Sequence, residues 1–255
     1  MSEGFQALIL AGSRGGVDPV ADYAGVAHKA LIVLEGETLL ARVAQALRDA
    51  GATRTAVSVS DDAVRAHATA LGLTVLTAAN GPSLSVREGL ATLGTPLMVT
   101  TADHALLQPE WIRRFRADAP ASADVAALLA RRDVIEHAAP GTKRTYLRFA
   151  DGAWSGCNLF QFATPRSIAA LDLWAQVEAD RKRPWRIVRR LGIGTLLRYL
   201  SGRLTLVEAI AHLGRMAGLN AAAVATPYGL AAVDVDKPGD LDLVRTLLAG
   251  QASAH

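Results

Sequence analysis

Cysteine, lysine and aromatic residues are all scarce in this chain of 255 residues. The single cysteine, Cys157, cannot form an internal disulfide or contribute to a zinc site built from several thiolates. A disulfide-stapled secreted scaffold is therefore excluded, and a reducing compartment is favoured. Aromatic residues make up 5% of the chain, which argues against a surface that stacks nucleic-acid bases. We expect no nucleic-acid partner.

Long apolar runs are also missing. The longest late stretch without a charge, residues 216–233, is interrupted by Asn220, Pro227 and Gly229, so we expect a helix end, a turn and a strand there, with no transmembrane segment. The first residues lack a basic segment followed by an apolar stretch and a small-residue cleavage site. These features predict a cytoplasmic protein.

The overall composition is that of a folded globular chain, with 51% hydrophobic and 20% charged residues. The net charge of +3 is unevenly distributed: residues 140–190 hold ten basic and four acidic side chains, a local charge of +6, which leaves −3 for the remainder. Such a basic segment suits a phosphorylated partner, and a solvated basic helix face is an equal alternative.

Short apolar runs and segments with helical spacing alternate up to about residue 118, which implies βαβ units and a mostly parallel, doubly wound α/β sheet. Strands are expected at 7–11, 55–59, 74–76 and 96–101. Helices are expected at 38–50, 61–71, 85–93 and 109–116.

Beyond residue 118 the regular alternation ends. Strands are expected at 125–129, 145–149, 158–162 and 231–236, with a helical tract at 166–219 and a last helix at 240–248. We predict a single domain over residues 1–255, with a helical insertion at approximately 140–225 that serves as a lid or acceptor-binding part. The apolar and basic part of this tract, 185–219, could face lipid, a partner subunit or the core, and core or dimer contact is the favoured alternative.

A glycine-rich loop follows the first predicted strand. Small residues let backbone N–H groups approach an anion, and an arginine adds a forked donor for phosphate oxygens. The loop reads Leu10, Ala11, Gly12, Ser13, Arg14, Gly15, Gly16. Neither the dinucleotide fingerprint G-x-G-x-x-G nor the P-loop pattern fits these positions, which disfavours hydride transfer and P-loop hydrolysis. A simple turn that needs positive φ remains the alternative.

The glycine-rich loop and the residues that follow it together resemble a known family. The run from Leu10 to Gly16, followed by Lys29-Ala30-Leu31 and a helix with Leu39 to Val43, resembles the opening signature of the MobA-like nucleotidyltransferases, which include sugar- and polyol-phosphate cytidylyltransferases. The resemblance implies a fold of the nucleotide-diphospho-sugar transferase, GT-A-like type. It also implies that the loop binds the nucleotide and that Arg14 and Lys29 contact the triphosphate. The chain departs from the signature at Ser13, where a second glycine is usual, and in its longer segment 17–27.

Two aspartates extend the resemblance. Asp103, after the buried strand at 96–101, resembles the aspartate that binds the catalytic metal of the family, and the carboxyl edge of an open α/β sheet is where a ligand is expected. The closing segment 233–241 is similar to the family pattern V-D-x-D-T-P-E-D-L, which makes Asp236 the second metal ligand by position. Strand alternation puts Asp234 on the same face, so it could share the metal, and either carboxylate could instead cap the last helix. Oxygen ligands and phosphates favour Mg²⁺.

The loop from Asn80 to Leu90 resembles the base- and ribose-binding loop of cytidylyltransferases. The resemblance implies that Ser83 and Ser85 offer hydroxyls to the base, and CTP is the nucleotide it favours. An equal alternative is that Ser85 only caps the helix that follows it.

The acceptor site is expected in the middle of the chain. Its candidates are Asn158, Arg148, Lys182 and Arg183. Cys157 is expected to be a small buried hydrophobe, and His104 is expected to be structural.

The sequence therefore predicts a Mg²⁺-dependent nucleotidyltransferase that joins an NTP, with CTP favoured, to a phosphorylated sugar, polyol or alcohol and releases pyrophosphate. A guanylyltransferase of a cofactor pathway and a glycosyltransferase of the same fold are the nearest alternatives. A non-catalytic nucleotide-binding protein is the alternative of another class. The acceptor and the oligomeric state, a homodimer included, stay open.

Overall fold

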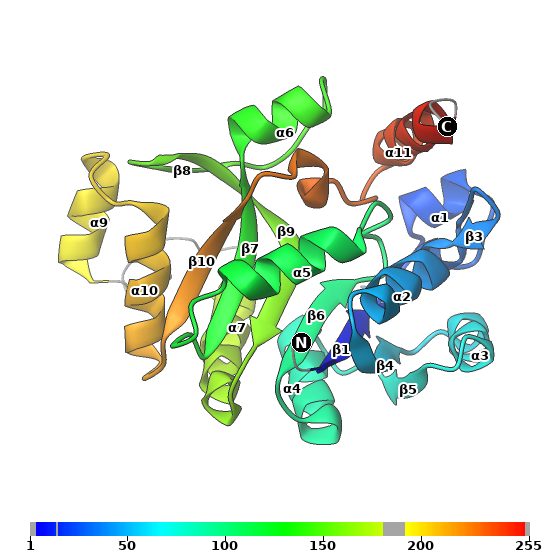
Figure 1. The fold of residues 1–255 in the computed structure, drawn as a ribbon, viewed down its shortest axis with the longest axis horizontal. Coiled ribbons are helices and arrows are strands. Elements are labelled where there is room, and N and C mark those ends of the chain that lie inside the picture. The colour runs from blue at the N-terminus through cyan, green and yellow to red at the C-terminus, as the bar shows by residue number, and fades with distance from the viewer. Residues whose placement is uncertain (1–3, 14, 181–191, 253–255) are drawn as a thin grey trace.

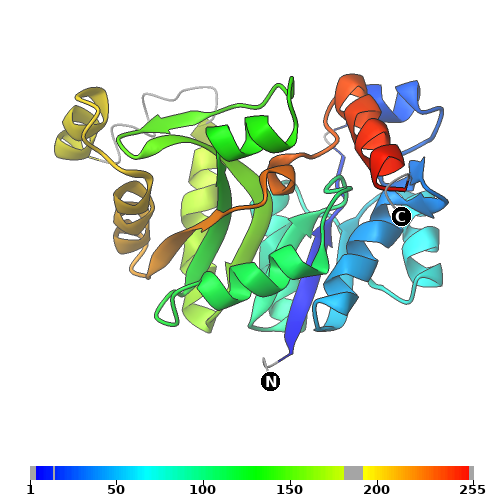
Figure 2. The same cartoon turned by 45° about the horizontal axis from the view of Figure 1, so that its top comes forward.

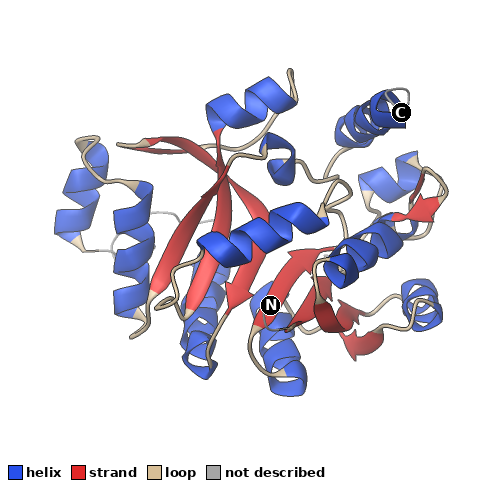
Figure 3. Cartoon of the chain, viewed as in Figure 1, coloured by secondary structure: helices blue, strands red, loops and turns tan. Residues whose placement is uncertain are grey.

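The computed structural model describes residues 4–13, 15–180 and 192–252. Within these residues, one mixed eight-stranded sheet has the order β10-β7-β9-β6-β1-β4-β5, with β8 paired to β9 (Figures 1 and 3). Its strands are β1 (Phe5–Leu10), β4 (Ala52–Val59), β5 (Thr74–Thr77), β6 (Leu97–Thr101), β7 (Val125–Arg131), β8 (Leu147–Phe149), β9 (Gly152–Phe162) and β10 (Ala221–Thr226). Strand β9 runs antiparallel to β6 and β7, while the other neighbours in this order are parallel. The predicted doubly wound, mostly parallel α/β sheet is confirmed. A separate small sheet pairs β2 (Val33–Leu34) with β3 (Glu37–Thr38).

Helices cover both faces of the main sheet, with α2 and α5 on one face and α4 and α7 on the other (Figures 1 and 2). The α-helices are α1 (Pro19–Tyr23), α2 (Leu39–Asp49), α3 (Asp62–Ala70), α4 (Pro82–Leu93), α5 (Pro109–Asp118), α6 (Arg132–Ala138), α7 (Ile168–Asp180), α9 (Ile193–Leu200), α10 (Leu206–Met216) and α11 (Pro238–Ala252). Short 3-10 helices are η1 (Lys29–Leu31), η2 (Pro165–Ser167) and η3 (Gly229–Ala232). None of the described helices has both the length and the apolarity needed to span a membrane.

The central strand β1 is buried on both faces, which explains its continuous apolar sequence. Leu8 packs in the cluster under α4 and α7, whereas Ile9 packs in the larger cluster under α2 and α5. Gly89 lets α4 lie close to the sheet, because a Cβ at this position would come within 2.5 Å of Leu8 Cδ2.

The strand predicted at 231–236 is wrong. This segment begins in η3 and then runs without regular structure, and the strand of this part of the chain is β10. The alternation of Val and Asp resembles a strand in the sequence. In the structure this stretch is instead tied to the end of β6 by a backbone hydrogen bond from Val235 N to Asp103 O. Packing decides the path instead: Gly229 lies so close to α6 that a Cβ would be 2.2 Å from Val134 O.

Several helix boundaries also differ from the predictions, and α4 starts at Pro82 instead of at residue 85. The helical tract expected at 166–219 is divided, because a turn at 201–205 separates α9 from α10, and Thr205 with Glu208 forms a capping box that starts α10. The last helix, expected at 240–248, starts at Pro238 and runs past Gly250. Within the segment of approximately 140–225, β9 and β10 belong to the main sheet.

Candidate active site

Three segments that are distant in sequence meet at the carboxyl edge of β1 and β6. Ala102 N donates to Leu10 O at 2.9 Å, which places the start of the glycine-rich loop beside the end of β6. Val235 N donates to Asp103 O at 3.0 Å, which attaches the segment 233–236 to the same point. This backbone arrangement brings Asp103, Asp234 and Asp236 together.

Lys29 reaches this edge from η1. His28 caps η1, since its Nδ1 accepts a hydrogen bond from Ala30 N at 3.1 Å, and Ala30 is fully buried. The long segment 17–27 folds into α1, which Asp18 caps and which packs on α11. The segment 17–27 therefore leads from the glycine-rich loop to η1 through a helix that rests on α11.

The ammonium of Lys29 joins the two predicted metal ligands. Its Nζ forms an ion pair with Asp103 Oδ2 and lies 3.5 Å from Asp236 Oδ1. Burial alone would raise the pKa of the Asp103 carboxyl, but the charge and hydrogen bond of Lys29, with a smaller contribution from Thr101, together outweigh it and hold this pKa below its usual value. Burial, with the Asp234 and Asp103 charges, raises the pKa of Asp236. The cluster thus holds more negative charge than Lys29 alone neutralises.

Asp234 has a different set of partners from Asp236. Its carboxylate forms an ion pair with Arg144 and accepts a hydrogen bond from Asn158 Nδ2 at 2.5 Å. Asn158 has a φ of +47° at an irregularity in the pairing of β9 with β7, a conformation that turns its amide towards Asp234. Arg144 and Asp234 are both well buried, with 11% and 7% of their side chains exposed.

The sequence model of the family described as "MobA-like NTP transferase domain" matches residues 7–192. The chain belongs to this family.

Solved structures share the fold of this chain. A hypothetical transferase from Thermus thermophilus is 31% identical, with a TM-score of 0.80, over 94% of this chain and 100% of that one. A CMP:2-keto-3-deoxy-manno-octonic acid synthetase complexed with CTP is 18% identical, with a TM-score of 0.58, over 96% and 99% of the two chains. A 2-C-methyl-D-erythritol 4-phosphate cytidylyltransferase, also from Thermus thermophilus, is 14% identical, with a TM-score of 0.55, over 97% and 100%. A search of the curated proteins gives no match.

In this MobA-like chain, Asp103 and Asp236 fit a hard divalent cation. Asp103 Oδ1 is buried and accepts no hydrogen bond from any described group, which leaves it free to ligate. Among the described residues, no group of three or more His, Cys, Asp or Glu side chains is placed to hold a metal. Two carboxylates suit Mg²⁺, which commonly takes one or two from the protein and the remaining ligands from phosphates and water.

The side chains of Asp234 and Asp236 do not cap α11. Asp240 Oδ2 instead accepts hydrogen bonds from Asp236 N at 3.2 Å and Lys237 N at 2.9 Å. The Asp236 carboxylate is thereby left to face Lys29.

The glycine-rich loop of this chain has two positions whose backbone conformation favours glycine. Gly15 and Gly16 have φ values of +77° and +83°. This geometry is what both an anion-binding loop and a simple turn require. Leu10, Ala11, Gly12 and Ser13 lead into it, and the predicted phosphate ligand Arg14 lies outside the described residues.

The two serines of the predicted base loop are buried in α4. Ser85 Oγ accepts a hydrogen bond from Ala79 N at 3.0 Å, and α4 starts at Pro82, so the alternative that Ser85 caps this helix is wrong. The hydroxyl ties the loop at 78–81 to the helix. Ser83 is 2% exposed.

The acceptor residues predicted from the sequence do not all meet. Asn158 lies in the aspartate cluster, Arg148 is exposed on β8, and Lys182 and Arg183 lie outside the described residues. Cys157 is buried, and this burial raises the pKa of its thiol, as expected of a small hydrophobe. Burial lowers the pKa of His104 to about 4, so the imidazole is neutral near neutral pH.

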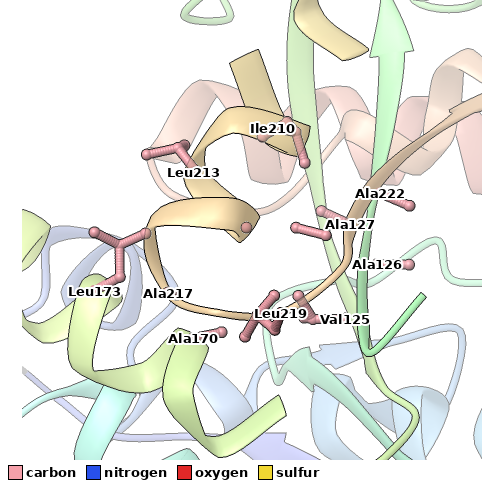
Figure 4. A pocket seen from close by; sticks show the side chains of 12 residues that line it. Val125, Ala126, Ala127, Ala170, Leu173, Ile210, Leu213, Ala217, Leu219 and Ala222 are labelled. Carbon is pink, nitrogen blue, oxygen red and sulfur yellow. The ribbon is translucent and has the colours of Figure 1, made fainter. Parts of the chain in front are cut away.

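An apolar pocket of about 150 Å³ lies elsewhere, between α7, α10 and the sheet (Figure 4). Val125 and Ala221, which begin β7 and β10, line it. Strands β6 and β7 point in the same direction, because both are antiparallel to β9. The pocket lies at the amino ends of β7 and β10, whereas Asp103 follows the carboxyl end of β6, so the two sites are at opposite edges of the sheet. Alanine, leucine, isoleucine, valine and glycine line it, so it offers no charged side chain for a triphosphate.

Arg144 and His28 are site residues that no sequence pattern predicted. Arg144 comes from the loop between α6 and β8, and nothing in the sequence pairs it with Asp234, which lies 90 positions later. His28 could have been found as a possible cap, because it directly precedes the Lys-Ala-Leu signature.

Proposed function

We propose that this protein is a Mg²⁺-dependent nucleotidyltransferase that transfers CMP from CTP to a phosphorylated small acceptor and releases pyrophosphate. The observation that carries the proposal is the meeting of Lys29 with Asp103 and Asp236 at the carboxyl edge of β6, beside the start of the loop at 10–16. A cation and paired carboxylates next to a glycine-rich loop are the groups that a triphosphate and its metal need.

The proposed reaction is an in-line displacement. A phosphate oxygen of the acceptor attacks the α-phosphorus, and the bond from that phosphorus to the oxygen that bridges to the β-phosphate breaks. Pyrophosphate leaves with the electrons of that bond. A bound Mg²⁺ would neutralise charge on the phosphates.

The chain itself has to position the reactants and balance their charge. Asp103 and Asp236 would hold the metal, while Lys29 and Arg14 would contact the triphosphate. Backbone N–H groups of the loop at 10–16 would bind its oxygens.

The choice of cytosine is supported by the resemblance of the loop from Asn80 to Leu90 to cytidylyltransferases. Two structures of similar fold are named for CTP-dependent chemistry, a synthetase complexed with CTP and a cytidylyltransferase. The choice of a sugar, polyol or alcohol phosphate is supported by the basic segment 140–190, which contains Arg148, Lys182 and Arg183. Asn158 would bind an acceptor hydroxyl from its position beside Asp234.

Pyrophosphate release tests the proposal. CTP, GTP, UTP and ATP are each incubated with Mg²⁺ and a pool of sugar, polyol and amino-alcohol phosphates, and we expect release with CTP and one acceptor class. Release with GTP alone would indicate a guanylyltransferase. In a parallel assay with nucleotide-sugar donors in place of NTPs, release of a nucleoside diphosphate would indicate glycosyl transfer. NTP binding without turnover in any pool would favour a binding protein.

A further inference from the structure

Helix α9 presents an apolar row to solvent. Ile193, Leu197 and Leu200, spaced at i, i+4 and i+7, are 76%, 60% and 69% exposed, and no residue of α9 is buried. The helix lies beside α10 at the far end of the molecule (Figures 1 and 2). For the tract 185–219 we expected contact with the core or with a second copy of the chain. Burial in the core is wrong for the α9 part of this tract.

The other side of α9 is fixed to the protein, so the apolar row has a defined direction. Thr195 Oγ1 lies 3.4 Å from His212 Nε2 of α10, and the Tyr199 ring packs edge-on against Phe149 at 5.8 Å. Arg198 forms an ion pair with Glu208 at 2.7 Å. These contacts orient the helix with its apolar row outward.

The part of the sequence that precedes and includes this helix is rich in positive charge. From residue 181 to residue 207 the sequence has eight basic and no acidic residues, whereas the rest of the chain has 19 basic and 24 acidic residues, a net charge of −5. Six of the eight lie at 181–191, outside the described residues and just before α9 in the sequence. Arg198 and Arg203 are described and exposed.

We propose that the outer face of α9 docks on an anionic phospholipid bilayer. An exposed apolar row in a basic stretch of sequence is typical of helices that lie in a membrane interface. There the apolar side chains enter the boundary of headgroups and acyl chains, and basic side chains meet lipid phosphates. The docking is peripheral. It does not depend on the nucleotidyl transfer proposed above.

A second copy of the chain fits this face less well. Specific dimers bury about 800 Å² on each partner, more than one row of three side chains provides. A two-fold contact through α9 would also bring like charges together, because Arg198 and Arg203, in and just after this helix, are both basic. A nucleic acid would match the charge but would leave Ile193, Leu197 and Leu200 in water.

Vesicle co-sedimentation of the full-length protein tests the proposal. We use phosphatidylcholine vesicles and phosphatidylcholine vesicles with about one-third phosphatidylglycerol. Binding is expected only to the anionic vesicles and should weaken at high salt. Leu197→Glu should reduce this binding by roughly tenfold or more, because it places a negative charge in the interface. Val33→Glu, at a residue that is 56% exposed on β2, is the matched control and should bind as the wild type does.

Thermal unfolding of both variants checks that neither loses its fold. Equal binding by Leu197→Glu and the wild type would overturn the proposal, as would the absence of binding to anionic vesicles. A dimer in light scattering that Leu197→Glu dissociates, without vesicle binding, would assign the face to a second copy. Binding to DNA or RNA that Arg203→Glu abolishes and Leu197→Glu preserves would assign it to nucleic acid.

Discussion

Lys29 and Asp103 form an ion pair at the end of β6, and Asp236 lies 3.5 Å from the same ammonium. The two carboxylates that are proposed to hold Mg²⁺ thus share one cation, which balances only one of their two charges. A metal bound by both aspartates would have to compete with Lys29 for Asp103. The triphosphate offers the ammonium a new partner, so binding of metal and nucleotide should favour each other.

Replacing Lys29 should separate its competition with the metal from its contact with the triphosphate. In Lys29→Met the carboxylates lose their internal cation, so Mn²⁺ binding without nucleotide should tighten by roughly tenfold. Binding of the NTP should weaken, since a triphosphate contact is lost. Paramagnetic resonance of free Mn²⁺ measures the first effect and equilibrium dialysis of CTP the second. Lys237→Met, an exposed lysine beside Asp236, should change neither, and weaker Mn²⁺ binding in Lys29→Met would contradict the competition.

Removing the charge of Asp103 should stop the reaction without unfolding the protein. Asp103→Asn keeps the shape of the side chain and leaves Lys29 near Asp236, so the melting temperature should change little. We expect kcat/KM to fall by at least about 10²-fold, the order of effect of removing one electrostatic contact to the transition state. Continuous pyrophosphate detection measures it, with the exposed Asp133→Asn as control. Activity equal to that of the control would exclude Asp103 as a metal ligand.

Much of the fold could be predicted because burial leaves a direct signal in the sequence. The apolar runs of β1 and β6 are continuous since both faces of these strands are covered, and Thr38 and Asp61 cap α2 and α3 as hydroxyl and carboxylate side chains commonly do. The aspartates of the site could be located from their place after a buried strand and from the family signature.

The parts of the fold and of the site that could not be predicted depend on contacts between segments that are distant in sequence. Arg144 and Asp234 become partners only when the chain returns to the end of β6, and no local pattern in either segment indicates this. The path at 231–236 is set by the close contact of Gly229 with α6 and by one backbone bond to Asp103, so the Val-Asp alternation that predicted a strand was misleading.

Arg144 should stabilise the fold through Asp234. Replacing it in Arg144→Met leaves a buried carboxylate without its cation, which costs about 3–5 kcal/mol in comparable buried pairs. Urea unfolding should show a loss of this size. Arg148→Met, four residues later and exposed on β8, should leave the free energy of unfolding nearly unchanged. Equal effects of the two substitutions would show that the buried ion pair contributes nothing.

His28 should make stability depend on pH. Burial, helped by the Lys29 charge, lowers its pKa below the ordinary value, while Asp61 opposes this. The unfolded chain then binds a proton near pH 6.5 more readily than the folded one, so the free energy of unfolding should fall as the pH drops below about 6.5. Protonation of Nδ1 would also remove the acceptor for Ala30 N.

His28→Asn tests this pH dependence. Asparagine does not titrate in this range and is a good N-cap, so the cap of η1 is retained. Urea unfolding at about pH 5 and about pH 7.5 should give a smaller difference for the variant than for the wild type, since every other histidine is common to both. An identical difference in the two proteins would mean that His28 is not the group responsible.

Gly229 should be intolerant of a side chain, because a Cβ there would lie 2.2 Å from Val134 O and 2.8 Å from Ala138 Cβ. Gly229→Ala has to push η3 away from α6, which should cost about 1–3 kcal/mol and displace the segment that carries Asp234 and Asp236. A lower melting temperature together with a lower kcat/KM is therefore expected. Gly239→Ala, in the first turn of α11 with nothing within 4 Å of the new Cβ, should keep both values. A stability loss in Gly229→Ala with full activity would show that the position of η3 does not control the aspartates.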